Sequence, residues 1–365
     1  MEHPENDELY KGLKVNKGIS DAPSVNPYLK KRIQRKEYTP AEFVEGILKG
    51  NITILSQAVT LVESARHEHQ QVAQEIIEKC LPHAGKSVRI GITGVPGAGK
   101  STSIDAFGMH LIQGKRKLAV LAIDPSSERT KGSILGDKTR MEELSREQNA
   151  FIRPSPSAGS LGGVARKTRE TIILCEAAGF DTIFVETVGV GQSETAVHSM
   201  VDFFLLIQLA GTGDELQGIK RGIMEMADGI IINKADGDNI EKANLAAAQF
   251  RNALHLFPPA DSGWFPNVLT YSGYYKLGIK EIWDMVDEYV VFTQKNGYFD
   301  YKRNEQAKYW MYESINETLQ NTFYHNPAVE GMLSVTEKQV LNNEISSFVA
   351  AKRMMDLFLD NLSKK

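Results

Sequence analysis

The stretch GVPGAGKST, residues 94–102, follows an apolar run and matches the pattern G-x-x-x-x-G-K-[ST]. In this pattern glycines let backbone N–H groups converge on phosphate oxygens, the lysine reaches the β- and γ-phosphates, and the following hydroxyl binds Mg²⁺. We therefore predict a nucleoside-triphosphate site with Lys100 as its catalytic cation. The predicted phosphate-binding residues are Gly94, Val95, Pro96, Gly97, Ala98, Gly99, Lys100, Ser101 and Thr102.

The tetrapeptide NKAD, residues 233–236, ends a later apolar run and bears on which base is bound. A carboxylate at Asp236 accepts hydrogen bonds from N1–H and the 2-amino group of guanine, whereas adenine would leave that charge unpaired. We therefore predict GTP as the ligand, with Asn233 and Lys234 as further nucleotide-binding residues. The segment YSG at 271–273 is where another loop could contact the base, although a plain turn explains it equally well. The candidates in this loop are Ser272, Gly273 and Tyr274.

These motifs must be positioned by the elements around them, and six short apolar runs rich in β-branched residues predict strands. Helical-length segments separate most of the runs, which predicts an α/β fold with a mostly parallel sheet covered by helices on both faces. Ligands of such sheets lie beyond the carboxyl ends of the strands, where both motifs fall. The six runs are SVRIGITG, KLAVLAID, DTIFVET, DFFLLIQLA, GIIINKAD and NVLTYS.

Helical patterns flank this region on both sides. TPAE at 39–42 is typical of a helix start, and a helical region is expected up to about residue 80. Beyond about residue 290, apolar residues recur every four positions, SVTE at 334–337 indicates a capping box, and a last helix carries apolar residues spaced by seven. That seven-residue seam fits a helix packed on its own domain as well as a dimer arm. The seam comprises Leu341, Phe348, Met355 and Leu362.

We accordingly divide the chain into a helical extension over 1–84, whose first ~35 residues could be flexible, a nucleotide-binding domain over 85–292 and a helical arm over 293–365.

Composition limits the compartment and the partners. The formal charge of -4, from 42 basic and 46 acidic residues, predicts neither nucleic acid nor an anionic membrane as a partner. Cys80 and Cys175 have no metal-ligand spacing, so neither a disulfide framework nor a zinc site is expected. The acidic start MEHPENDELY lacks the pattern of a signal or transit peptide, and FFLLIQLA is too short to cross a bilayer. We expect a cytoplasmic protein.

Several longer motifs resemble one family. GVPGAGKST, AIDPSS, GSILGDKTRM, ETVGVGQSE, GTGDELQGIKRGIMEMAD and NKAD occur in the order seen in the MeaB/ArgK group of P-loop GTPases, from about residue 40 onward. The resemblance implies a P-loop GTPase domain with a helical amino-terminal extension and a carboxyl-terminal dimerisation arm, hence a homodimer. It also implies a GTPase chaperone for adenosylcobalamin-dependent methylmalonyl-CoA mutase or a related acyl-CoA mutase. The chain carries no cobalamin-binding signature of its own.

The resemblance further implies a Mg²⁺ site and the positions of the switches. Asp124 in AIDPSS, Asp137 in GDKTRM and Glu186 at the start of ETVGVGQSE would join Ser101 in an oxygen-rich set that suits Mg²⁺. Glu186 is also a catalytic candidate. Asp124 could instead only cap a turn, and Asp137 could be an ordinary surface carboxylate.

Two more switch residues are expected from the same likeness. Gly189 would bring its N–H near the γ-phosphate, and Lys220 in GTGDELQGIK is a catalytic candidate in a third switch. Ras-type proteins place a water-orienting glutamine directly after the switch II glycine, whereas this chain has Val190 there and Gln192 two residues later. We therefore expect hydrolysis to be slow without a partner.

Two other functions remain open from the sequence. Related GTPases that insert nickel would show a Cys-x-x-Cys or a His-rich tract, and the nearest feature is HEH at 67–69, whose two histidines face different sides of a helix. An older name of the group suggests an ATPase or kinase of amino-acid transport systems, but no phospho-acceptor-binding domain is evident.

Overall fold

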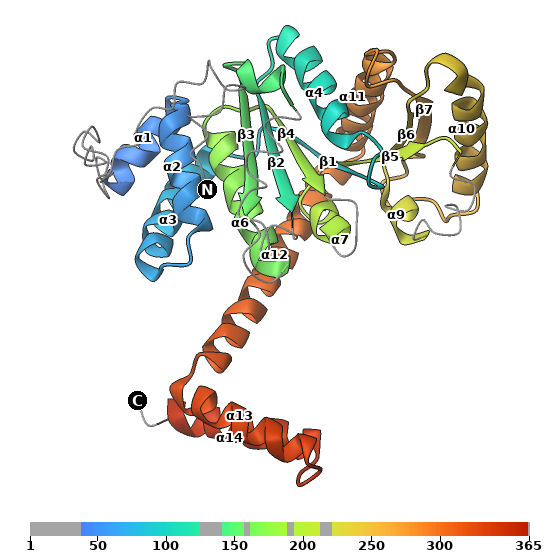
Figure 1. Ribbon diagram of the computed structural model, residues 1–365. Coiled ribbons are helices and arrows are strands. Elements are labelled where there is room, and N and C mark those ends of the chain that lie inside the picture. The colour runs from blue at the N-terminus through green and yellow to red at the C-terminus, as the bar shows by residue number, and fades with distance from the viewer. Residues whose placement is uncertain (1–37, 125–140, 157–160, 188–192, 212–220, 364–365) are drawn as a thin grey trace, which may run out of the picture. The chain divides into compact units, whose positions relative to one another are not determined.

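The computed structural model describes residues 38–124, 141–156, 161–187, 193–211 and 221–363. Residues Pro40–Lys365 form one compact unit, and its centre is a seven-stranded sheet in the order β3-β2-β4-β1-β5-β6-β7 (Figure 1). All six strand pairings are parallel, so the carboxyl ends of the strands share one edge. The strands are β1 Val88–Gly94, β2 Leu118–Asp124, β3 Ala150–Pro156, β4 Thr182–Thr187, β5 Phe203–Leu209, β6 Gly229–Asn233 and β7 Asn267–Thr270.

The six predicted strands are present, and β3 is an additional strand that the sequence pattern did not indicate. Its sequence AFIRPSP contains Pro154, and proline cannot donate to a strand ladder. Among the described strands, β3 pairs with β2 alone and lies at the edge of the sheet, which is where a strand tolerates proline.

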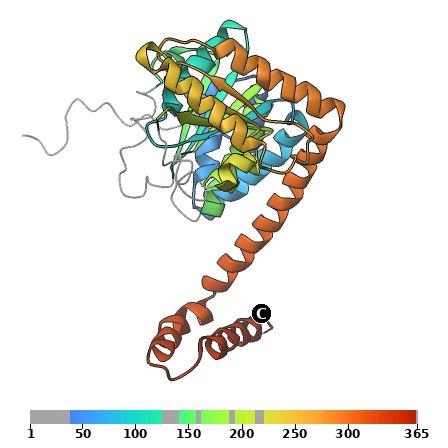
Figure 2. The ribbon, with the colours of Figure 1, turned by 90° about the vertical axis from the view of Figure 1, so that its right-hand side faces the viewer.

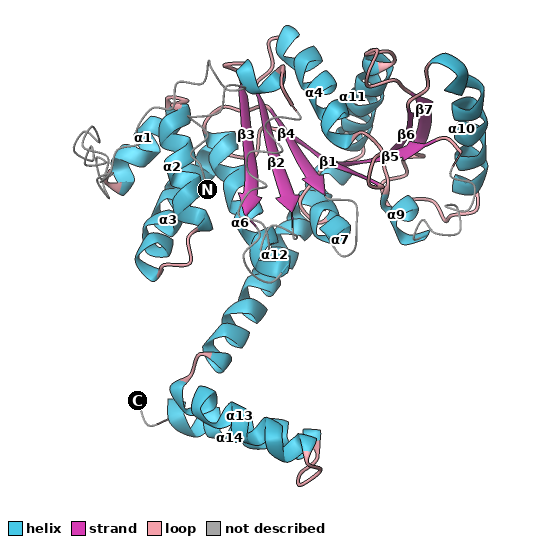
Figure 3. Ribbon diagram, in the orientation of Figure 1, coloured by secondary structure: helices cyan, strands magenta, loops and turns pink. Residues whose placement is uncertain are grey.

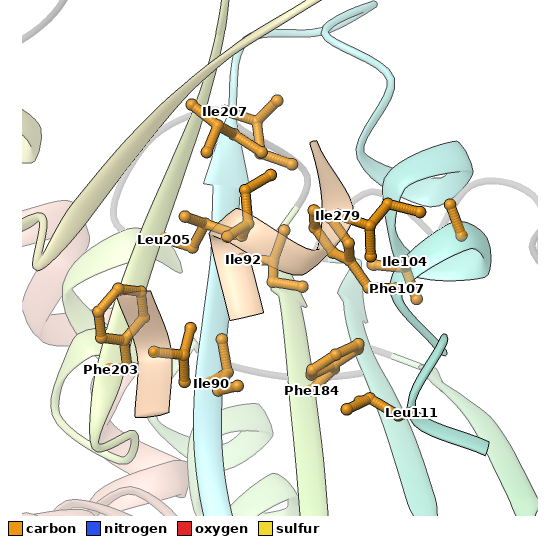
Figure 4. Packing of buried hydrophobic residues seen from close by; sticks show 14 of the residues in the cluster. Ile90, Ile92, Ile104, Phe107, Leu111, Phe184, Phe203, Leu205, Ile207 and Ile279 are labelled. Carbon is orange, nitrogen blue, oxygen red and sulfur yellow. The ribbon is translucent and has the colours of Figure 1, made fainter. Parts of the chain in front are cut away.

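Helices cover both faces of the sheet (Figure 3), because alternate residues of a strand point to opposite sides. Leu205 and Ile207 of β5 pack with one face cluster, whereas Leu206 between them packs with another. The first cluster includes residues of α4 Lys100–Gln113 and α11 Ile279–Lys295, as Figure 4 shows for Ile104 and Ile279. The second includes residues of α9 Arg221–Met226 and α10 Ile240–Leu254. The predicted α/β fold is therefore confirmed.

In the described residues from 38 onward, three helices precede the sheet: α1 Pro40–Leu48, α2 Ile52–Glu63 and α3 His67–Cys80. Asn51 caps α2 by accepting from the N–H groups of Thr53 and Ile54. The helices pack on α6 Leu161–Ala177, and Glu63 forms an ion pair with Arg153 of β3. Other short helices among the described residues are α7 Ser193–His198 and the 3₁₀ turns Leu81–His83, Leu144–Arg146 and Gly237–Asn239.

The carboxyl-terminal helices are α12 Tyr298–Tyr324, α13 Pro327–Leu341 and α14 Ser347–Leu362 (Figure 2). Two expectations are wrong here. SVTE lies inside α13, whose cap is Asn326 with Pro327 as the first helical residue, so a Ser and a Glu at capping spacing did not mark a helix start. The seam of seven-residue spacing is interrupted, because Leu341 ends α13 and the other three residues belong to α14.

The α13–α14 pair has a small core of Val329, Met354 and Phe358, against which Phe323 of α12 packs. Within the described residues, no helix has the length and apolar character to cross a membrane. The division at residues 84/85 and 292/293 stays a prediction.

Candidate nucleotide-binding site

The predicted phosphate loop connects β1 to α4 at the carboxyl edge of the sheet. Gly99 caps α4 with φ +86°, and a Cβ at this position would lie 2.6 Å from Nδ2 of Asn233. Only glycine fits that conformation and that space. Lys100 Nζ donates to the carbonyl oxygens of Gly94 at 2.8 Å and Val95 at 3.3 Å, so the cation lies over the loop that would hold phosphate.

Two buried carboxylates lie near Lys100. Burial lowers the pKa of the lysine, and the charges of Glu186 and Glu194 partly oppose that lowering. Glu186 is 8% exposed and Glu194 is 2% exposed. The sequence pattern did not single out Glu194, because nothing in it shows that α7 Ser193–His198 begins directly after the switch motif with this carboxylate in its first turn.

Ser101 and Glu186 form the described part of the predicted Mg²⁺ set. Ser101 Oγ donates to Glu186 Oε1 at 3.1 Å, which brings together a hydroxyl and a carboxylate oxygen, the hard ligands that suit Mg²⁺. Behind them Thr187 Oγ1 donates to Thr93 Oγ1 at 2.8 Å and ties the ends of β4 and β1 together. The two residues fit the ion.

The other predicted ligands are only partly visible. Asp124 ends β2 at the same edge, but its side chain lies outside the described residues. Asp137, Gly189 and Lys220 lie entirely outside them. Among the described residues, no three His, Cys, Asp or Glu side chains gather as a metal cluster.

Asn233 links the phosphate loop to the predicted base site. Its Nδ2 donates to Ala98 O at 2.7 Å, and its Oδ1 accepts from Gly273 N at 3.1 Å and Lys234 N at 2.7 Å. The side chain is 3% exposed, so these bonds are shielded from water. The sequence predicted Asn233 as a binding residue but did not reveal that it joins three loops.

Asp236 and Ser272 meet at the base site. Ser272 Oγ donates to Asp236 Oδ2 and accepts from Tyr275 N at 3.2 Å. Tyr274 is 81% exposed in the same turn. The structure thus brings the predicted residues 233, 236, 272 and 273 together, although they come from two separate loops.

The histidines of HEH do not converge. His67 contacts Gln71 at 3.1 Å, whereas His69 Nδ1 contacts Ser64 Oγ at 2.8 Å. Both contacts are local to α3 and its start, so the structure does not favour a metal-delivery site there.

A parallel sheet that carries a phosphate loop after β1 and NKAD after β6, at one edge, defines a P-loop GTPase. The chain belongs to the family of methylmalonyl-CoA mutase-associated GTPases called MeaB, whose family model matches residues 55–328. The predicted family and the prediction of a GTPase are thereby confirmed.

Relatives agree with this membership. A putative GTPase of Caulobacter vibrioides is 49% identical over 86% of this chain and 95% of its own length. The GTPase ArgK of Escherichia coli is 44% identical over 88% of this chain and 97% of its own length. A mouse protein named methylmalonic aciduria type A homolog, mitochondrial, is 44% identical over 86% of this chain and 78% of its own length. A solved structure titled LAO/AO transport system kinase has a TM-score of 0.70 at 38% identity and covers 89% of this chain and 99% of that one.

Proposed function

We propose that this GTPase gates the loading or protection of adenosylcobalamin in methylmalonyl-CoA mutase or a related acyl-CoA mutase. The observation that carries the proposal is the match to a family described as associated with that mutase, which spans every motif from the phosphate loop to NKAD. The name of the mouse relative points to the same metabolism. We further propose a cytoplasmic location, with which two buried free cysteines are compatible.

We assign the nucleotide to the residues from Gly94 to Thr102, the NKAD side chains and the turn at 272–274. Lys100 would exchange the carbonyl oxygens of Gly94 and Val95 for phosphate oxygens, which offer a buried ammonium a negative charge. Ser101 and Glu186 would hold Mg²⁺, which when bound supplies positive charge for the phosphates. Asp124, Asp137, Gly189 and Lys220 remain predicted parts of the same site.

Asp236 would read guanine, with Ser272 as its partner when the base is absent. Because Asn233 already fixes the phosphate loop relative to the base loop, these two loops need little ordering on nucleotide binding. Val190 in place of a water-orienting glutamine supports slow hydrolysis until a partner completes the site.

Mutase binding tests the proposal. An adenosylcobalamin-dependent methylmalonyl-CoA mutase should bind the full chain with a Kd that differs by at least about tenfold between GDP and a non-hydrolysable GTP analogue, as calorimetry would measure. The basis is that gating requires the two nucleotide states to differ in affinity for the partner. Equal affinity in both states, or no binding in either, would refute switch-coupled chaperoning.

We also propose that the arm joins two copies of the chain. A groove of about 850 Å³ between α12, α13 and α14 is lined mainly by apolar side chains. Leu341, which lines the groove, is 80% exposed, and Phe348 in the first turn of α14 is 86% exposed, which is high for large apolar residues without a partner. Further exposed apolar residues of the arm are Met311, Ile315, Leu319, Met355, Leu359 and Leu362.

Phe348→Glu should weaken dimerisation by at least about tenfold, because a buried phenylalanine is worth about 1.5–3 kcal/mol and a symmetric interface contains it twice. Sedimentation velocity over a range of concentrations measures this. Leu256→Glu is a matched control, since Leu256 is 79% exposed beyond the end of α10 and outside the arm. A parent protein that stays monomeric, or a Phe348→Glu variant that dimerises like the parent, would contradict the arm as the interface.

A further inference from the structure

One side of α12 binds the four residues that connect α7 to β5. Trp310 Nε1 donates to Ser199 O at 3.0 Å, and Gln306 Nε2 donates to Val201 O at 2.8 Å. Lys302 Nζ donates to Asp202 O at 2.8 Å. We call residues 199–202 together with these α12 side chains and Arg303 the α12 clasp.

Arg303 makes the strongest contact of the clasp. Its Nε and Nη2 donate to the two carboxylate oxygens of Asp202 at 2.8 and 2.7 Å, a bidentate pair. Asp202 is 2% exposed and also accepts from Arg89 N at 2.8 Å. The same guanidinium donates to Gly85 O and Ser87 O at 2.6 Å each. A buried pair with so many fixed partners cannot slide, so α12 and residues 199–202 must move together or separate.

The opposite end of α7 faces the phosphate loop. Glu194 in its first turn is buried and adds to the charge that Lys100 experiences. Five residues separate β4, which ends beside the Ser101–Glu186 contact, from Ser193 at the start of α7. α7 therefore lies between the nucleotide site and the clasp in sequence, packs on the strands β1 and β4 that end at this site, and carries a charge that acts on Lys100.

His198, the last residue of α7, lies beside the clasp. Burial and then the charge of Lys302 lower the pKa of His198 to about 4, so the imidazole is neutral at pH 7. Its ring packs edge-on against Phe204 with centroids 5.5 Å apart. Val197 is fully buried, and α7 packs on β4 and β1. A helix held on this much of its surface shifts as a unit.

We propose that the α12 clasp couples the nucleotide state to the carboxyl-terminal arm: a displacement of α7 that follows phosphate binding is passed through residues 199–202 to α12. The inference rests on the proposed function, because it names how the GTP site would regulate the surface that α13 and α14 present. It requires no contact between the arm and the nucleotide. For this coupling it is sufficient that α7 and α12 have two discrete positions and that the γ-phosphate changes the populations of these positions.

Trp310 reports on the clasp directly, because it is one of only three tryptophans and its indole N–H is in the contact. In the full-length Trp264→Phe/Trp283→Phe variant, we expect Trp310 emission to differ between GDP and a non-hydrolysable GTP analogue, both with Mg²⁺. Hydrogen exchange of the unmodified protein gives the same test without substitutions: amides of 199–202 and of 302–310 should change protection together. Identical emission and exchange in the two states, with bound analogue verified, would overturn the proposal.

Gln306→Leu removes one clasp donor at similar side-chain size and should reduce the Trp310 difference by at least about twofold, with nucleotide affinity unchanged. Lys308→Gln is the matched control on the exposed side of the same helix, where Lys308 pairs only with Glu305 among described residues. If the Trp310 emission of Gln306→Leu differed between the two nucleotides as much as in the parent, the coupling would not run through the clasp. Mutase binding that still depends on nucleotide in that case would leave the proposed function intact, so the two failures are distinguishable.

Discussion

Replacing Asp236 with asparagine is expected to weaken GTP binding by about 10³-fold and to make xanthosine triphosphate the better ligand. The carboxylate would accept from N1–H and the 2-amino group of guanine. The asparagine side chain has one amide oxygen and one NH₂ group instead, so one acceptor is lost and the NH₂ group would point at a hydrogen-bond donor of guanine. Xanthine carries a carbonyl where guanine carries the amine, so the same amide suits it. Fluorescent-nucleotide titrations with both bases measure the change.

Asp238→Asn is the control for that experiment, because Asp238 is an exposed carboxylate two residues further along the chain. It should leave both affinities unchanged. An Asp236→Asn variant that still prefers GTP by the parental ratio would contradict the assigned base site. The hydrogen bond from Ser272 to Asp236 predicts an intermediate effect for Ser272→Ala, since the carboxylate would then be less well oriented but still charged.

Glu186→Gln should raise the Mg²⁺ concentration needed for half-maximal GTP hydrolysis by up to about 100-fold. Glutamine keeps the length and an oxygen that can accept from Ser101, so the loop geometry is retained while the negative charge is lost. Magnesium titration of hydrolysis and of GDP affinity separates an effect on the ion from an effect on folding. Glu75→Gln, at an exposed pair with Lys79, should leave both curves at their parental positions.

An unaltered magnesium dependence in Glu186→Gln would remove this residue from the proposed metal set. Because the assigned role of Glu186 is to hold the ion with Ser101, nucleotide affinity at saturating magnesium should change far less than the magnesium requirement.

The central sheet was predictable because its strands are buried on both faces and therefore appear as continuous apolar runs. β3 was not predicted, and the reason is physical. Arg153 and the two prolines are acceptable at a sheet edge, but they break the apolar pattern that marks a central strand. The arm was predictable only in part. The seven-residue spacing of its apolar residues continues across the turn between α13 and α14, so the spacing alone does not show that one helix ends and another begins there.

The types of the site residues could be predicted from motif chemistry, but their mutual contacts could not. Asn233 reaches Ala98 and Gly273, which are 135 and 40 residues away, so no local pattern signals the cross-link. Gln306 lies in a polar helical stretch that resembles a solvated surface, yet it is 6% exposed because its partner Val201 is 105 residues distant. Tertiary packing decides such cases.

The edges of the sheet bear on how the protein can associate. An open strand edge recruits strands from other chains and so favours aggregation. At one edge, Pro154 and Pro156 of β3 have no N–H to offer an added strand. At the other, β7 has only four residues, and Arg251 already donates to Val268 O at 3.3 and 3.4 Å. Among the described residues, neither edge is a good template for β-augmentation, so the association proposed above would not proceed by extending the sheet.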